Sequence, residues 1–155
     1  MSDGVDNQPG AGPFEGPPRD PDCIFCKIVA GELPSRKVYE DDHAIAFLDL
    51  QPWHRGHTLV VPRDHVESFV SGAPLLAELG PAIDACARLL VQRLNADGIN
   101  LSSSAGPVAG QEVMHLHVHL VPRYADAPGL RNLIDPRPAD PAELDAVLAQ
   151  INGAP

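Results

Sequence analysis

Residues 113–123 read Val-Met-His-Leu-His-Val-His-Leu-Val-Pro-Arg, and the rest of the chain is interpreted outward from this stretch. In a β-strand every second side chain points to the same face. One face would then carry His115, His117 and His119. The other would carry the apolar side chains Met114, Leu116, Val118 and Leu120. The apolar set makes a good core face, whereas no core needs three imidazoles in a row. The histidine face therefore indicates a functional site, and the alternative is a polar strand face that is exposed to solvent.

The spacing of these histidines indicates that the three do not all have the same role. Neighbours on one strand face are about 6.6 Å apart and the outer pair about 13 Å. A metal ion with bonds of about 2 Å can therefore be shared by neighbours at most. Neutral imidazole attacks phosphorus when one ring nitrogen is free and the other is held by a hydrogen bond. We predict at least two roles, with His117 as the nucleophile and His119 as a donor to the phosphoryl oxygens or the leaving group.

Composition limits the class of protein. The chain has 155 residues, enough for one domain with a real core, and 44% of them are apolar. A formal charge of -10 argues against nucleic acid or an anionic membrane as a partner. There is no apolar run of about 20 residues and no signal-peptide pattern at the N-terminus. Three cysteines do not form a secreted disulfide framework, so we expect a cytoplasmic protein.

The chain is predicted to contain three parts. Residues 1–21 are rich in Pro, Gly and Asp and are expected to form a disordered tail, followed by a domain over residues 22–124. Residues 125–155 form an extension whose helix starts at the cap Asp140. The domain is predicted to be α+β, with a mostly antiparallel sheet and one main helix over residues 74–95, broken at Gly80-Pro81. Strands are expected over residues 38–39, 44–50, 57–61, 99–104 and 112–121, and a short helix over 23–30.

Two further features have more than one interpretation. Cys23-Ile24-Phe25-Cys26 could be a redox pair, a pair of packed thiols, or half of a tetrahedral zinc site completed by histidines. His65 follows a predicted strand and His115 begins another, so both are available to such a site. His57 begins a strand and could be either a site residue or a solvent-exposed one.

Several separated blocks resemble the histidine triad (HIT) superfamily, in its Hint-type branch of nucleotide phosphoramidases and hydrolases with an N-terminal Cys-x-x-Cys. The main block, residues 110–123, reads Gly-Gln-Glu-Val-Met-His-Leu-His-Val-His-Leu-Val-Pro-Arg. The other blocks occupy residues 23–34, 39–42, 46–49, 56–62 and 97–101. Together they cover most of residues 22–124 in the family's order.

The resemblance implies hydrolysis or transfer at the α-phosphate of a purine-type nucleotide through a covalent nucleotidyl-histidine. It makes His117 the nucleophile, with His119 and His57 at the phosphate and leaving group. Gln111 and the backbone near Val113 would hold the phosphate, and Asp49 would bind the ribose. Asn100 and Ser104 also fall on nucleotide-site positions. The base slot would be formed by Ile24, Phe25, Ile28, Phe47, Leu48 and Leu50.

The resemblance also implies a structural zinc ion, with Cys23, Cys26, His65 and His115 as its ligands, and a homodimer. One departure stands out: the family's Asn-x-Gly is Ser104-Ala105-Gly106 here, and Ser has a shorter reach toward a phosphate. We therefore expect a nucleotide phosphoramidase or polyphosphate hydrolase. A dinucleoside tetraphosphate hydrolase or phosphorylase, and a nucleotide-binding module with little catalysis, are the alternatives.

Overall fold

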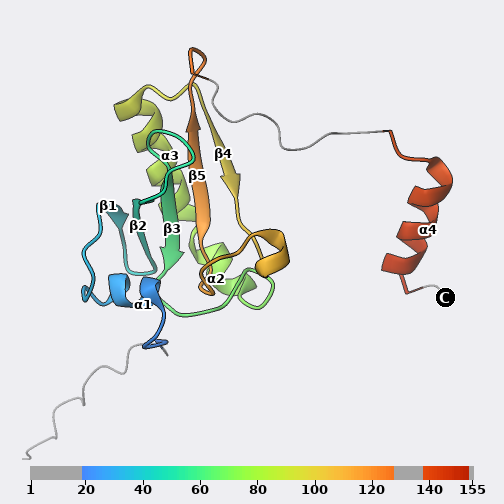
Figure 1. Ribbon diagram of the computed structural model, residues 1–155, viewed down its shortest axis with the longest axis horizontal. Helices are drawn as coiled ribbons and strands as arrows, with labels where there is room; N and C mark the ends of the chain where they lie inside the picture. Colours follow the sequence, from blue (N-terminus) through green and yellow to red (C-terminus); the bar gives the residue numbers. More distant parts are fainter. Residues whose placement is uncertain (1–18, 128–137, 154–155) are drawn as a thin grey trace, which may run out of the picture.

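The computed structural model describes residues 19–127 and 138–153 and contains a five-stranded antiparallel sheet in the order β1-β2-β3-β5-β4 (Figure 1). The strands are β1 (Lys37–Glu40), β2 (Ala44–Leu48), β3 (Thr58–Pro62), β4 (Gly98–Ser102) and β5 (Val118–Arg123). The helices are α1 (Ile24–Val29), α2 (Ala73–Glu78), α3 (Gly80–Leu94) and α4 (Pro141–Ile151), with a 3₁₀ turn at Pro107–Ala109. This α+β architecture confirms the predicted fold class.

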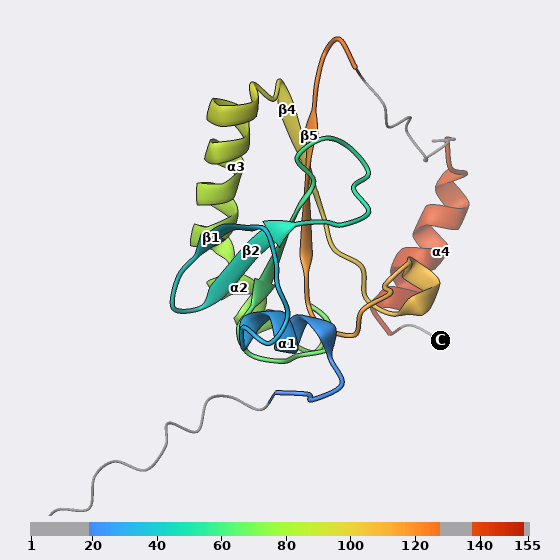
Figure 2. The ribbon, with the colours of Figure 1, turned by 60° about the vertical axis from the view of Figure 1, so that its left-hand side comes forward.

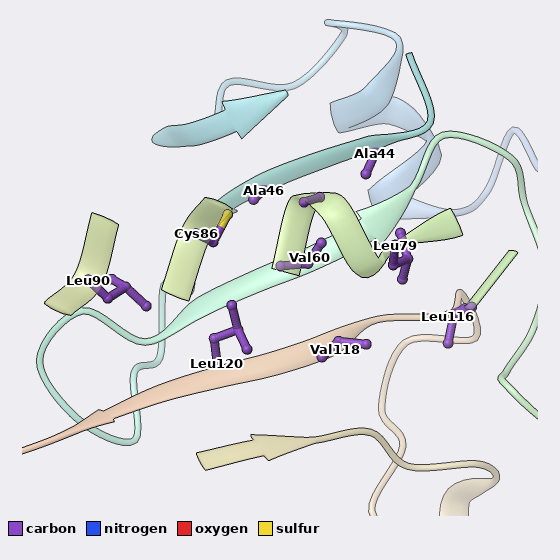
Figure 3. Close-up of a cluster of buried hydrophobic side chains, with 10 residues drawn as sticks. Ala44, Ala46, Val60, Leu79, Cys86, Leu90, Leu116, Val118 and Leu120 are labelled. Atoms are coloured by element: carbon purple, nitrogen blue, oxygen red, sulfur yellow. The ribbon is translucent and has the colours of Figure 1, made fainter. Parts of the chain in front are cut away.

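One face of the sheet packs against α3, which runs alongside it in Figure 2. Alternate residues of β2 and β5 point to this side, as the period of a strand requires. Figure 3 shows how Cys86 and Leu90 of α3 face them across the core. The fully or nearly fully buried members of this core are Ala44, Ala46, Val60, Leu79, Ala82, Cys86, Leu90, Leu116, Val118 and Leu120. The predicted core face of the histidine stretch is therefore correct for Leu116, Val118 and Leu120.

The opposite face of the sheet packs against α1. Its core contains the intervening strand residues together with the helix and its cap: Cys23, Phe25, Cys26, Ile45, Phe47, Leu59 and Val61. The Phe25 and Phe47 rings meet edge to face, with centroids 5.6 Å apart. Because β2 and β3 bury both faces, they read as nearly continuous apolar runs.

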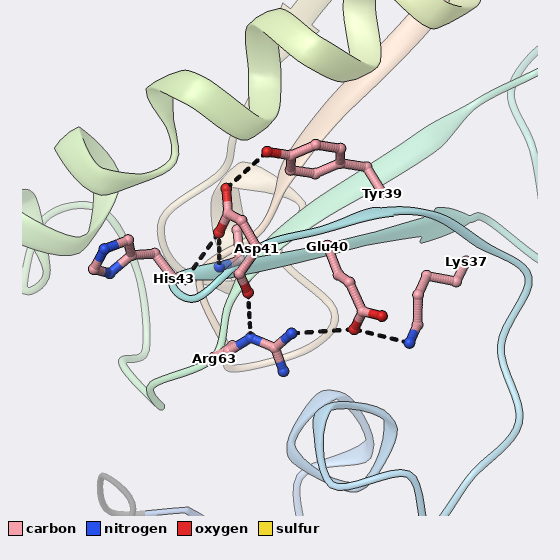
Figure 4. Close-up of polar contacts among 7 residues, drawn as sticks. Lys37, Tyr39, Glu40, Asp41, His43 and Arg63 are labelled. Atoms are coloured by element: carbon pink, nitrogen blue, oxygen red, sulfur yellow. Dashed lines mark hydrogen bonds and ion pairs between the residues drawn. The ribbon is translucent and has the colours of Figure 1, made fainter.

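Polar contacts fix the turn between β1 and β2 (Figure 4). The Asp41 carboxylate accepts hydrogen bonds from the backbone N–H groups of His43 and Ala44, each at 2.8 Å, and from the Tyr39 hydroxyl at 3.1 Å. Arg63, just beyond β3, donates to the Asp41 carbonyl at 2.7 Å and pairs with Glu40 at 3.1 Å. These contacts hold the start of β2 against the end of β3.

The predicted main helix forms as two pieces, α2 and α3, divided at Leu79-Gly80 as expected from the Gly-Pro pair. The predicted strand over residues 112–121 is wrong in its first half, because β5 begins only at Val118.

Near the C-terminal end, Asp140 caps α4 by accepting a hydrogen bond from the Ala142 N–H, as predicted. The tail predicted over residues 1–21 falls mostly on residues 1–18, which lie outside the described residues. Among the described helices, none has the length and apolar character needed to cross a membrane.

Candidate active site

Residues 113–117 form an irregular segment that neighbouring backbone groups hold in place. The Leu116 N–H donates to the Val66 carbonyl at 2.7 Å, which replaces the strand pairing expected there. The buried Gln111 amide donates to the carbonyls of Glu67 and Val113, at 2.6 and 3.0 Å, and accepts from the Gly106 N–H at 2.8 Å. All these Gln111 contacts are with protein backbone, and Gln111 does not line the cleft described below. Its role in the structure is to hold the loop.

A cleft of about 520 Å³ opens beside this segment, within the size range of small-molecule sites. All six residues predicted for the base slot line it, as do Asp49, Ser104, Val113, His117 and His119. Asn100 does not line it, because it lies exposed on β4 and accepts a hydrogen bond from Arg123 at 2.7 Å. The structure thus gathers most of the predicted nucleotide-site residues around one space and leaves Asn100 and Gln111 outside it.

Hydrogen bonding fixes the tautomer of His117. Its Nδ1 lies 2.7 Å from the carbonyl oxygen of His115, and a carbonyl can only accept, so Nδ1 carries the proton. In the neutral ring Nε2 then holds a lone pair. The ring is 6% exposed and lines the cleft, and the edge of Phe25 packs against it with centroids 5.3 Å apart. This is the state that a nitrogen nucleophile requires.

A second chain of hydrogen bonds sets the tautomers of His57 and His119. The backbone N–H of Trp53 must donate, so His57 Nδ1 accepts it at 3.0 Å and the His57 proton lies on Nε2. That proton points to His119 Nδ1, 2.9 Å away. In neutral His119 the proton is therefore on Nε2, which is a donor. His57 is 1% exposed, so the interpretation of His57 as a solvent-exposed strand residue is wrong.

Burial keeps these rings neutral. Burial, together with the neighbouring His117 and His57, lowers the pKa of His119 to about 4, although Asp49 opposes the shift. Burial also lowers the pKa of His57, against the attraction of the Asp49 carboxylate, whose oxygen lies 3.7 Å from His57 Nε2. Near pH 7 the pair thus supplies N–H donors rather than cations.

Asp49 follows β2 directly and projects a carboxylate into the cleft. One carboxylate oxygen accepts from the Gln51 N–H at 2.8 Å, which fixes the side chain through a short local turn. With His57 and His119 it places three ligand-type atoms within 4.8 Å of one another. Two of these atoms, however, are already joined by the His57–His119 hydrogen bond.

A separate Cys–His cluster lies under α1. Cys23 and Cys26 at the start of the helix meet His65 and His115, and their four ligand atoms lie within 4.8 Å of one another. His115 Nδ1 is 3.5 Å from each sulfur and 3.3 Å from His65 Nδ1, and Cys26 Sγ is 3.3 Å from His65 Nδ1. A tetrahedral zinc site requires about 3.3 Å between nitrogens and about 3.5 Å between nitrogen and sulfur. The observed distances match this geometry.

The chemistry of these groups agrees with a cation site. His115 donates from Nε2 to the Pro62 carbonyl at 3.0 Å, which turns the lone pair of Nδ1 toward the cluster. Burial lowers the pKa of His115 to about 4 and raises that of the Cys26 thiol to about 11. A cation among the ligands would favour the thiolate. Since His115 also supplies the carbonyl that orients His117, the Cys–His cluster and the cleft share one structural element.

The sequence interpretation missed several cleft residues. Trp53 is the most consequential: its ring stacks on His119 with centroids 4.5 Å apart and an interplanar angle of 15°. Its position beside His54, in a polar turn before His57, gave no sign of this contact. The wall of the cleft also includes Pro34, Ser35, Arg36, Gln51, Leu59, Ala109, Gly110 and Glu112. Loops supply most of these residues, so no strand or helix periodicity could identify them.

The fold and the site define a class: an antiparallel sheet carrying a histidine cluster beside an apolar cleft, with a Cys–His cluster that takes His115 from the loop of the nearby His117. The HIT domain family model matches residues 30–126, and the chain belongs to the HIT family.

Several solved structures are similar to the chain. SMU.412c from Streptococcus mutans has a TM-score of 0.82 and 40% identity, over 87% of this chain and 86% of that one. A histidine triad nucleotide-binding protein from Candida albicans has a TM-score of 0.74 and 30% identity, over 84% and 95%. A Zn-bound histidine triad family protein from Mycobacterium smegmatis has a TM-score of 0.65 and 35% identity, over 85% and 96%.

Proposed function

We propose that this protein is a nucleotide hydrolase that cleaves a nucleoside phosphoramidate or polyphosphate at the α-phosphate through a covalent nucleotidyl-His117. The observation that carries the proposal is the tautomer of His117. Its Nδ1–H is committed to the His115 carbonyl at 2.7 Å, which leaves the Nε2 lone pair for the cleft. The similar protein from Candida albicans is named as nucleotide-binding, in agreement with a nucleotide ligand.

The substrate would lie along the cleft. Its base would enter the apolar slot lined by Ile24, Phe25 and Phe47, and its ribose hydroxyls would donate to the Asp49 carboxylate. Ser104 lines the cleft and offers a hydroxyl to the phosphate. The α-phosphorus would then lie beside His117.

In the first step His117 Nε2 forms a bond to phosphorus, and the leaving group departs with the electron pair of its own bond. His119 Nε2–H donates a hydrogen bond to the leaving atom. A phosphate leaving group departs as the anion, whereas an amine leaving group takes a proton from solvent as its bond to phosphorus breaks. The phosphorylated His117 carries a positive charge, and its ring centroid lies 5.0 Å from that of His119. In the second step water bonds to phosphorus, the N–P electron pair returns to His117, and the water proton passes to solvent.

We test the proposal by replacing His117 with alanine and following AMP release from an adenosine phosphoramidate. Turnover should be abolished while the unfolding midpoint changes little. The matched control is His43→Ala, because His43 is an exposed histidine that does not line the cleft. Full activity in His117→Ala would refute the assignment. Product analysis with and without added phosphate separates a hydrolase from a phosphorylase.

We further propose that Cys23, Cys26, His65 and His115 hold a structural zinc ion. The support is the match of the nitrogen and sulfur distances to tetrahedral geometry, and the Zn-bound relative from Mycobacterium smegmatis. None of the four residues lines the cleft, so the ion would act on folding and on the position of His117. Metal analysis of the purified protein should give one zinc per chain.

A homodimer is also proposed, on the expectation from the family that the main helix and a strand pair across a two-fold axis. The edge strand β4 exposes Leu101 to 56%, and α3 exposes Val91 to 45%. Light scattering should give twice the chain mass, and Leu101→Glu should reduce it to the monomer value. A monomer at micromolar concentration would exclude the dimer.

A further inference from the structure

Trp53 is in an unusual position for a large aromatic side chain. It lies in the loop between β2 and β3 and lines the cleft. Its ring stacks on His119 at 4.5 Å and is tilted against His57 at 4.8 Å. The contacts with the two imidazoles place the indole at the end of the cleft that contains the leaving-group donor.

The packing of the protein core does not account for this indole. It belongs to neither of the two core clusters and is 52% exposed although one face is covered by imidazole. Leu50, in the same loop and also in the cleft wall, is 80% exposed. This loop therefore presents apolar surface to the cleft beyond what folding requires.

Two aromatic side chains in the cleft wall each contact a histidine of the site. Phe25 packs its edge on His117 from the side of α1. Trp53 stacks on His119 from the β2–β3 loop. Because attacking and leaving atoms lie in line across phosphorus, the leaving group extends away from His117, which contacts Phe25, and toward His119, which contacts Trp53.

We infer that the exposed part of the Trp53 indole forms a leaving-group subsite for a planar aromatic moiety, either an aromatic amine side chain or a second nucleobase. The inference rests on the proposed function and names the class of substrate for the same site. An indole offers a large rigid face for stacking at little cost in conformational entropy. A role as a simple cover over the His57–His119 pair would instead affect all leaving groups equally.

The experiment compares two adenosine phosphoramidates, of 2-phenylethylamine and 2-cyclohexylethylamine, which have the same carbon number but differ in planarity. The wild-type chain should favour the phenyl substrate in kcat/KM by about 2- to 10-fold, the range expected for one aromatic pair. Trp53→Phe should retain most of this preference, and Trp53→Leu should bring the ratio to about one. A ratio of one in wild type, or an unchanged ratio in Trp53→Leu, would overturn the inference.

A second readout separates this inference from the proposed function. Trp53 is the one tryptophan of the chain, so its fluorescence reports on this position. In His117→Ala, which removes the nucleophile, the phenyl compound should bind more tightly than the cyclohexyl compound by a similar factor and should change the emission. If this preference holds while the wild type releases no AMP, the subsite stands and the hydrolase proposal falls. Equal affinities would exclude the subsite even in an active enzyme.

Discussion

Gly72→Ala tests whether the loop that supports the histidine segment is as tightly packed as the structure indicates. A Cβ at Gly72 would lie 2.6 and 2.8 Å from the two methyl carbons of Val66 and 3.1 Å from the Ser68 carbonyl oxygen. Val66 is stiff about χ1, and its carbonyl holds the Leu116 N–H at 2.7 Å. Val66 therefore cannot move aside without disturbing Leu116, which directly precedes His117.

The φ of Gly72 is -125°, within reach of alanine, so the expected destabilisation is purely steric. Overpacking of this kind costs about 1–3 kcal/mol. For a chain of this size, that lowers the unfolding midpoint by roughly 2–12 °C. We also expect a lower kcat, because displacement of Val66 moves the segment that carries the nucleophile.

The matched control is Gly98→Ala, since a Cβ at Gly98 meets nothing within 4 Å and its φ is also accessible to alanine. Its free energy of unfolding should change by less than about 0.5 kcal/mol. Thermal unfolding of both variants, followed by circular dichroism, gives the comparison. Equal midpoints for the two variants would show that the space beside Gly72 is not as tightly packed as these distances indicate.

Three other predictions concern the site. In NMR titrations of the free protein, His119 should titrate near pH 4; a value near 6.5 would contradict its burial. Because its folded-state pKa lies below the ordinary value, the stability it contributes is complete above about pH 6.5 and is lost as the pH falls toward 4. Cys26→Ser should lose zinc and lower the unfolding midpoint, whereas wild-type zinc content would exclude Cys26 as a ligand. Asp49→Asn should raise KM roughly 10- to 100-fold through weaker ribose binding, and an unchanged KM would remove the ribose from that position.

Much of the architecture could be predicted because the spacing of apolar residues along a helix or strand indicates which side chains are buried. The division at Gly80-Pro81, the core side of Leu116, Val118 and Leu120, and the cap at Asp140 all follow from local rules of spacing and backbone geometry. Resemblance to the HIT family placed the base-slot residues, and all six of them line the cleft.

The start of β5 could not be predicted from periodicity. Residues 113–117 keep the alternation of a strand, but the Leu116 N–H bonds to Val66, a residue 50 positions away in the chain, instead of to a sheet partner. The result is that His115 turns to the cysteines and His117 to the cleft. The surroundings of His115 and His117 differ, as the predicted difference in role requires, whereas the single strand face assumed for the three histidines was wrong.

The role of Trp53 depends on contacts that no local pattern encodes. Its ring meets His119, which is 66 residues further along the chain and lies on another strand. Gln111 shows the converse: its motif suggested phosphate binding, whereas its described hydrogen bonds go to the backbone of the loop. Contacts between residues far apart in the chain therefore determine both the stacking of Trp53 and the hydrogen bond of Gln111 to the Glu67 carbonyl.

The most direct test of the central claim is the intact mass of the wild-type chain, quenched within seconds of mixing with an adenosine phosphoramidate. We expect a species heavier by one AMP, with peptide mapping placing the nucleotide on His117, and no such species in His117→Ala. Release of AMP with no adduct at any mixing time, or an adduct on another residue, would contradict the assignment of His117 as the nucleophile.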